Sequence, residues 1–383
     1  MIYLDNAATS GKKPQSVITA VDNALKNLSA NPGRSGHDLS LKAADAVYGV
    51  RSKIASFFGA EGGEKVIFTQ NCTHAINCVL KGVIQKGEHI VVSNLEHNAV
   101  MRPLKKMGAY FTVANAENST DQTIENFKAA IKPNTRLVFV TGASNVTGQI
   151  LPVAELGLLC KKRGILFGVD AAQTAGVLPI DMQKMNIDFL CIAPHKGLYA
   201  PMGTGVLIAR KPLKYTVLEG GTGTESVNFS QPLDLPEGFE SGTVNVPCVM
   251  GVGAGIDFVK KVGMHNIYKH EFSLLNALYK RLEKIANIKL YTQLPSFGNT
   301  APVLPFNFEG CDSFLLGSEL NKNGIAVRSG LHCAPTAHKT MSTVNNGAVR
   351  VSFGVFNNYK EVEILSNILA DKNFAKKLQK PID

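Results

Sequence analysis

Lys196 and Asp170 have the chemistry of a cofactor site, and each follows closely on an apolar run that we predict to be a strand. Lys196 follows the run 189–192, and Asp170 follows the run 165–169, about 25 residues upstream. An enclosed lysine can form an imine with an aldehyde, and a carboxylate can keep a pyridinium nitrogen protonated. At the carboxyl edge of a parallel sheet the two would suit a pyridoxal cofactor. The ordinary alternatives are a surface lysine and an aspartate that caps a helix.

Thr73 and His97 are two further candidates that follow predicted strands. Thr73 opens a helical pattern after the run 65–69, where free backbone N–H groups and the helix dipole favour a phosphate. His97 comes after the run 89–93 and can stack on a flat ring or move protons. The alternatives are a helix-capping threonine and a buried, hydrogen-bonded histidine.

Cys333 is the best nucleophile candidate among the seven cysteines. It stands between Gly330 and Pro335 in a predicted loop, where Arg328 and His332 can favour its thiolate. Two other cysteines, Cys160 and Cys191, lie in apolar surroundings typical of a core. The histidines near Cys333 lack the paired spacing of a structural zinc site, so we expect no metal.

Composition narrows the class of protein. A chain of 383 residues with 45% hydrophobic and 18% charged residues is typical of a globular protein with two domains. Seven cysteines without a CxxC pair indicate a reducing compartment. The net charge of +10 is dispersed in lysine doublets, which argues against nucleic-acid binding. The N-terminus has no signal-peptide pattern and no apolar run is long enough for a membrane span, so we expect a cytoplasmic protein.

The elements that must position these residues follow an alternating pattern. Continuous apolar runs alternate with helical patterns such as 73–83 and 153–163, which predicts an α/β fold with a mostly parallel sheet covered on both faces. Residues 211–246 form a long segment without periodicity, which is typical of a functional or interface loop. Further strands predicted in the sheet are 136–140 and 205–209, and further helices are 247–262, 265–285 and 360–369.

Taken together, these motifs resemble the class V aminotransferase family of fold-type I pyridoxal-phosphate enzymes, and within it the cysteine desulfurases of the SufS-like group. The resemblance covers nearly the whole chain, through residues 3–9, 170–173, 195–196, 328–334 and 350–353. It implies a fold-type I transferase with a mostly parallel central sheet flanked by helices, and a smaller α+β domain built from both chain ends. The expected domains are 14–255 (large, cofactor-binding) and 1–13 with 256–383 (small).

The resemblance also assigns roles around pyridoxal 5'-phosphate. Lys196 would carry the cofactor as a Schiff base and then move the Cα proton. Asp170 would pair with the pyridine nitrogen, Gln173 with the ring oxygen, and His97 would stack on the ring. Asn145 would lie close to cofactor and substrate.

Phosphate and substrate contacts are implied in the same way. Thr73 and His195 resemble phosphate ligands of the same subunit, and Thr243 resembles one that is donated by the other subunit of a homodimer. Arg350 would hold the substrate carboxylate in a bidentate pair. Cys333 resembles the cysteine that accepts sulfur. Ala8 and His37 are two additional expected substrate contacts.

The implied activity is conversion of L-cysteine to L-alanine, with a persulfide on Cys333 that passes to a sulfur-acceptor protein, for example in iron–sulfur cluster assembly. Selenocysteine lyase, sulfinate desulfinase and other class V activities are alternatives. A cofactor-binding sulfur-relay scaffold without turnover is a non-enzyme alternative. Three positions depart from the family pattern: Ala193 replaces a serine or threonine, and Cys72 and His74 replace a threonine and an acid.

Overall fold

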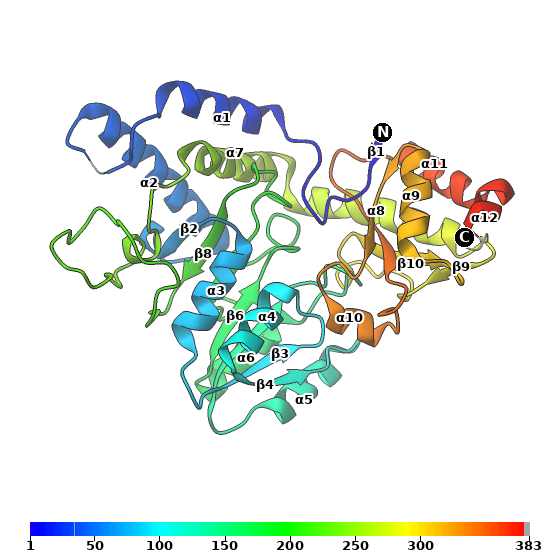
Figure 1. Cartoon of the computed structure of the whole chain (residues 1–383), viewed down its shortest axis with the longest axis horizontal. Helices are drawn as coiled ribbons and strands as arrows, with labels where there is room; N and C mark the ends of the chain where they lie inside the picture. Colours follow the sequence, from blue (N-terminus) through cyan, green and yellow to red (C-terminus); the bar gives the residue numbers. More distant parts are fainter. Residues whose placement is uncertain (34, 379–383) are drawn as a thin grey trace.

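The computed structural model describes residues 1–33 and 35–378, and a seven-stranded sheet forms its centre (Figure 1). The strands run in the order β2-β8-β7-β6-β5-β3-β4. All neighbours are parallel except β8, which is antiparallel to both β2 and β7, so the predicted mostly parallel sheet is confirmed. The bounds are β2 Val66–Thr69, β3 His89–Ser93, β4 Tyr110–Ala114, β5 Thr135–Thr141, β6 Leu166–Asp170, β7 Phe189–Ile192 and β8 Gly205–Ala209.

Helices cover both faces of this sheet because most of its strands are apolar on both sides. Along β5, Val138 and Val140 pack into the core on one face, while Leu137 and Phe139 pack into the core on the other. The first face is covered by α2 Asp38–Phe58, α5 Thr120–Ala130, α6 Val153–Arg163 and α7 Val246–Val262. The second face is covered by α3 Cys72–Val83 and α4 Asn98–Met107. Helix α1 Gln15–Asn27 packs on α7.

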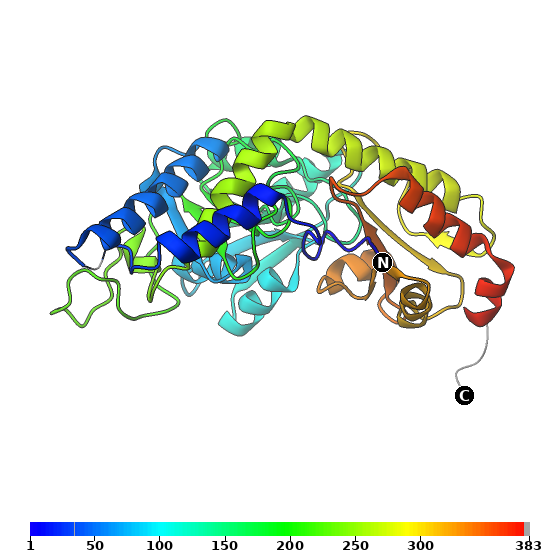
Figure 2. The same cartoon turned by 90° about the horizontal axis from the view of Figure 1, so that it is seen from above.

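A smaller antiparallel sheet of four strands, in the order β12-β13-β10-β9, lies beside the first assembly (Figures 1 and 2). The N-terminal strand β1 pairs with β11 next to it, so the start of the chain joins its last third. The strands are β1 Ile2–Tyr3, β9 Ile288–Leu290, β10 Val303–Phe308, β11 Ile325–Ala326, β12 Arg328–Gly330 and β13 Ala348–Ser352. The helices are α8 Met264–Leu282, α9 Ser313–Lys322, α10 Pro335–Thr340, α11 Tyr359–Ala370 and α12 Lys372–Leu378.

The segment between β8 and α7 is a long loop, as predicted, and it projects from the large assembly in Figure 1. Its only regular element is a 3-10 turn over Glu237–Phe239. Val227 and Phe229 are almost fully exposed at 96% and 105%. The end of the loop is fixed by Glu240, which forms a buried bidentate pair with Arg51. Within the described residues, no helix combines the length and apolarity that a membrane span requires.

Candidate active site

A cavity of about 220 Å³ opens at the carboxyl ends of β5, β6 and β7 and lies between the two sheets. It therefore lies at the strand ends where an open α/β sheet binds ligands. Nine of the predicted site residues line it: Ala8, Thr73, His97, Asn145, Asp170, Gln173, His195, Lys196 and Arg350. The three that do not line it are His37, Thr243 and Cys333.

Lys196 lies in a turn that follows β7. The backbone N–H of Lys196 donates to the Ala193 carbonyl at 3.1 Å, and its own carbonyl accepts from Tyr199 N–H at 3.0 Å. Burial lowers the pKa of the Lys196 amine, and the nearby Asp170 carboxylate partly opposes this shift. The result is an amine that loses its proton more readily than a surface lysine.

Asp170 is the last residue of β6 and is only 4% exposed. Its Oδ1 accepts hydrogen bonds from the backbone N–H of Ala172 at 2.9 Å and from the thiol of Cys72 at 3.6 Å. No described residue donates to Oδ2. Burial, followed by the charge of Asp170, raises the pKa of the Cys72 thiol well above its ordinary value, so the thiol stays protonated and acts as a donor. One carboxylate oxygen is thus fixed by the protein while the other is available to a ligand.

The N-terminus of α3 points to an anion site. Asn71 caps the helix by accepting from His74 N–H at 2.9 Å, and no described residue accepts from the backbone N–H groups of Cys72 and Thr73. Across the cavity, the Nδ1 atom of His195 is buried without a partner among the described residues. Burial, with the charge of Lys196, lowers the pKa of His195 to about 4, so its ring is neutral at pH 7. The free N–H groups of α3, together with a His195 ring that carries its proton on Nδ1, would suit a phosphate group, although Ala193 adds no hydroxyl.

His97 is held as the N-cap of α4. Its Nδ1 accepts from the backbone N–H of Ala99 at 3.0 Å, which leaves the ring proton on Nε2. Burial lowers the pKa of His97, and the positive charge of Lys196 lowers it further against the opposing Asp170. The neutral imidazole therefore lines the cavity with a fixed orientation.

Arg350 is one of the residues that the small sheet contributes to the cavity. It lies on β13, is 1% exposed, and donates from Nη2 to Asp5 Oδ1 at 2.6 Å and from Nη1 to the Asn145 carbonyl at 2.9 Å. Asn145 in turn donates from Nδ2 to the His332 carbonyl at 2.8 Å. The role of Asp5 was not predicted, although the residue lies within the motif 3–9, because no local pattern pairs it with an arginine 345 residues away.

The Cys333 side chain is exposed just outside this cavity, in the turn between β12 and α10. Its carbonyl accepts from Asn98 N–H at 2.7 Å, and its Sγ lies 3.9 Å from Nη2 of Arg328. His332 and Cys333 both have positive φ angles, 50° and 56°. Non-glycine residues in this conformation cost about 1–3 kcal/mol each and persist only where the surrounding structure holds them.

One part of the prediction for Cys333 is wrong. His332 was expected to favour the thiolate, but its ring is buried, and burial lowers its pKa to about 2. Its nitrogens face His338 and the Arg328 carbonyl rather than the thiol. A neutral ring that points away supplies no positive charge, so Arg328 is the cation beside Cys333.

Thr243 and His37 lie away from the cavity of their own chain. Thr243 is exposed at the end of the long loop, beside a separate hollow that also includes Thr69 and His74. His37 is an exposed N-cap of α2, where its Nδ1 accepts from Ser40 N–H at 3.2 Å. Their predicted roles stay predictions.

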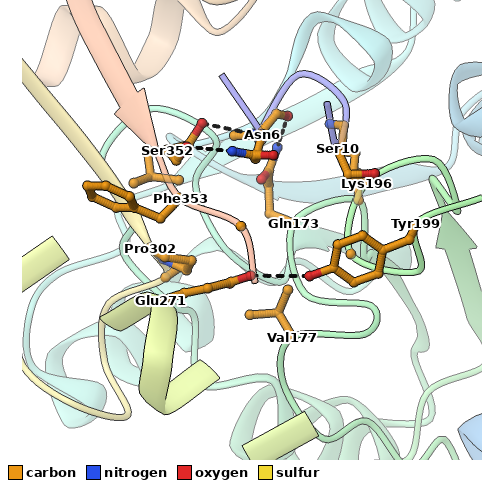
Figure 3. Close-up of a pocket in the computed structure, with 16 residues that line it drawn as sticks. Asn6, Ser10, Gln173, Val177, Lys196, Tyr199, Glu271, Pro302, Ser352 and Phe353 are labelled. Atoms are coloured by element: carbon orange, nitrogen blue, oxygen red, sulfur yellow. Dashed lines mark hydrogen bonds between the residues drawn. The ribbon is translucent and has the colours of Figure 1, made fainter. Parts of the chain in front are cut away.

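A second, smaller cavity of about 40 Å³ is lined by Lys196 and Gln173, which also line the first cavity (Figure 3). It is lined by both assemblies, and Figure 3 shows Glu271 of α8 directed at Tyr199, whose hydroxyl donates to it at 3.3 Å. Burial raises the pKa of Glu271 to about 8. Gln173 donates from Nε2 to the Ala7 carbonyl at 3.0 Å, which ties the site to the N-terminal segment. Among the described residues, no group of three or more His, Cys, Asp or Glu could hold a metal ion.

The sequence is similar to a known family of enzymes and to several of its members. Residues 2–365 match the family model for class-V aminotransferases. The chain is 33% identical over 381 residues to a probable cysteine desulfurase from Methanothermobacter thermautotrophicus, covering 97% of this chain and 94% of that protein. It is 31% identical over 379 residues to a cysteine desulfurase from Haloferax volcanii, covering 95% and 88%.

Solved structures give the same result. A cysteine desulfurase from Thermococcus onnurineus NA1 superposes with a TM-score of 0.87 at 32% identity, covering 96% of this chain and 94% of that one. The cysteine desulfurase CsdA from Escherichia coli gives a TM-score of 0.84 at 26% identity, covering 98% and 95%. These matches confirm the predicted fold class. The chain belongs to the class V aminotransferase family.

Proposed function

We propose that this chain is a pyridoxal-phosphate-dependent cysteine desulfurase, which converts L-cysteine to L-alanine and takes the sulfur onto Cys333. The observation that carries the proposal is the cavity in which the buried amine of Lys196, the carboxylate of Asp170 and the guanidinium of Arg350 converge. The similarity to proteins named cysteine desulfurase supports the choice of substrate.

The residues present fit the cofactor. The free N–H groups at the start of α3, the Thr73 hydroxyl and the orphaned His195 Nδ1 would hold its phosphate. The available Oδ2 of Asp170 would hold its ring nitrogen, and the neutral His97 ring would cover one face. Pyridoxal phosphate supplies an aldehyde that reacts with amines and a ring that withdraws electrons from Cα.

In this proposal Lys196, Arg350 and Asp5 have separate roles. Burial lowers the pKa of Lys196, so its amine gives up a proton more readily than a surface lysine and can then act as a nucleophile and as an acceptor for the Cα proton. Arg350 keeps N–H groups beyond the two that bind Asp5 and Asn145, and these would bind the substrate carboxylate. Asp5 balances the buried guanidinium and fixes its plane.

Cys333 stands where it can take the sulfur. The preceding residue, His332, lines the cavity, while Cys333 itself is exposed at its rim beside Arg328. A bond forms between Cys333 Sγ and the sulfur of the substrate while the substrate Cβ–S bond breaks, and the three-carbon product takes up a proton to become alanine. The exposed persulfide would then be accessible to an acceptor protein or a reductant.

The active unit in this proposal is a homodimer. Thr243 does not line the cavity of its own chain, and the same loop exposes Val227 and Phe229. Exposed apolar side chains on a projecting loop are typical of an interface. A second copy packed there would bring Thr243 to the partner's phosphate site. The seven free cysteines support a cytoplasmic location.

The test is to incubate the purified protein with pyridoxal phosphate, a thiol reductant and L-cysteine, and to quantify sulfide and alanine together. Equal amounts of both are expected, with none from Lys196→Ala and no sulfide from Cys333→Ala. Selenocysteine and cysteine sulfinate are run in parallel to separate the alternative substrates. Wild-type-like turnover by Lys196→Ala, or no turnover of L-cysteine by wild type, would contradict the proposal.

A further inference from the structure

Three buried side chains below the Cys333 turn form a hydrogen-bonded chain that the reaction described above does not use. Thr343 Oγ1 lies 2.7 Å from His338 Nδ1, His338 Nε2 lies 3.1 Å from His332 Nδ1, and His332 Nε2 lies 3.4 Å from the Arg328 carbonyl. All three side chains belong to residues that are at most 4% exposed. Buried polar groups arranged in this way fix one conformation when every member is satisfied.

The direction of this chain follows from its last member. The Arg328 carbonyl can only accept, so His332 Nε2 carries the proton and His332 Nδ1 accepts from His338 Nε2–H. His338 Nδ1 must then accept from the Thr343 hydroxyl. This hydroxyl also lies 3.4 Å from the His338 carbonyl, but the shorter contact of 2.7 Å takes its single proton. Burial lowers the pKa of His338 to about 4 and that of His332 to about 2, so both rings are neutral and the chain is intact at pH 7.

The hydrogen-bonded chain ends at Arg328, which lies beside the proposed nucleophile, Cys333. Arg328 lies on β12 opposite Arg350 of β13, and its guanidinium is the cation 3.9 Å from Cys333 Sγ. The turn is also held from the large assembly: the Asn145 side chain donates to the His332 carbonyl, and the backbone N–H of Asn98 donates to the Cys333 carbonyl. The buried rings of His332 and His338 add a third set of contacts to this turn, in which His332 and Cys333 both have positive φ.

We propose that Thr343 and His338 are positioning residues for Cys333: through the ring of His332 they fix the turn that keeps the thiol beside Arg328 at the rim of the cavity. The inference rests on the proposed function. It assigns these residues no contact with substrate or cofactor. Their effect is on the sulfur-transfer step rather than on amino-acid binding.

The test compares Thr343→Val, which removes the hydroxyl at nearly constant volume, with Thr343→Ser, which keeps it. Thr340→Val, at an exposed position of α10, is the control for loss of a hydroxyl outside this hydrogen-bonded chain, because Thr340 Oγ1 hydrogen-bonds to Asn94 and the Thr336 carbonyl instead. In the holoenzyme, Thr343→Val leaves His338 Nδ1 without its donor and is expected to lower kcat for L-cysteine about tenfold, with KM unchanged within about twofold. Thr343→Ser is expected to restore kcat, and Thr340→Val to leave it unchanged.

A second readout is independent of turnover. Alkylation of Cys333 by iodoacetamide, followed on its own peptide by mass spectrometry, is expected to slow by about threefold or more in Thr343→Val, because a thiol held beside a cation is the more reactive one. If Thr343→Val gives no folded holoenzyme, Thr343→Ala takes its place against Thr343→Ser. Wild-type kcat together with a wild-type alkylation rate in the Val or Ala variant would overturn the inference. A wild-type enzyme that releases no sulfide would instead refute the proposed function, and the alkylation comparison would still decide the positioning role.

Discussion

Replacing Glu240 by glutamine tests how the loop that carries Thr243 is held. The Glu240 carboxylate accepts from both Nη atoms of Arg51, at 2.7 and 2.5 Å, and from Phe68 N–H at 2.5 Å. The two side chains are only 9% and 7% exposed. The substitution keeps an acceptor but leaves the Arg51 guanidinium buried without a counter-charge.

Loss of one partner from a buried ion pair costs about 3–5 kcal/mol, and we expect the lower end here because the glutamine oxygen still accepts one bond. A chain of 383 residues unfolds with an entropy of about 0.8 kcal/mol/K, so 3 kcal/mol lowers Tm by about 4 °C. Far-UV circular dichroism is the suitable probe, since the chain has no tryptophan. The matched control is Asp22→Asn, which breaks an exposed pair with Lys26 and costs at most about 0.5 kcal/mol.

The same variant has a second expected effect, on the cofactor. Thr243 follows Glu240 by three residues, so a loosened loop would place it less well in the partner's phosphate site. We expect Glu240→Gln to lose bound pyridoxal phosphate faster than Asp22→Asn during dialysis, followed by visible absorbance. A Tm within about 1 °C of wild type would refute the reasoning on the buried pair, because that pair would then contribute no more than an exposed one.

Three further outcomes are expected. Arg350→Lys should raise KM for L-cysteine at least about tenfold with the fold retained, because one ammonium cannot replace a bidentate guanidinium, and an unchanged KM would count against the carboxylate role. Lowering the pH from about 6.5 to 4 should lower the urea concentration at the midpoint of unfolding. His195 and His338 have folded pKa values of about 4, so over this range the unfolded chain binds more protons than the folded one. A midpoint that does not change would contradict the burial of both residues as neutral rings. Glu271→Gln should raise Tm at pH 9 but hardly at pH 5. Between the ordinary glutamate pKa and the folded pKa of about 8 the unfolded chain binds fewer protons than the folded one, so the wild-type chain loses stability as the pH rises over this range. Equal Tm at pH 9 would argue against a buried neutral acid.

The parts of the fold with continuous apolar strands could be predicted from the sequence. The predicted runs 189–192 and 205–209 coincide with β7 and β8, because strands buried on both faces have unbroken apolar composition and abrupt ends. The helical pattern 153–163 coincides with α6 for a similar reason: its exposed and buried positions alternate with helical periodicity. The N-terminal helices α1 and α2 were not predicted.

The convergence of the site was also predictable, because Asp170 and Lys196 follow neighbouring parallel strands. The supporting contacts were not. Asp5 reaches Arg350 across 345 residues of sequence, and Cys72 reaches Asp170 across 98, so both contacts depend on how the assemblies pack. His332 was misread because a histidine between glycine and proline has the pattern of an exposed loop, and its burial against His338 leaves no local signal.

The central claim is that sulfur from L-cysteine passes onto Cys333 with the help of Lys196. Its most direct test is mass spectrometry of the Cys333 peptide after one turnover with L-cysteine, quenched with an alkylating agent that traps persulfides. We expect the mass of one additional sulfur atom on this peptide in wild type, and none on it in Lys196→Ala. The additional sulfur on another cysteine, or on Cys333 in the Lys196→Ala variant, would contradict it.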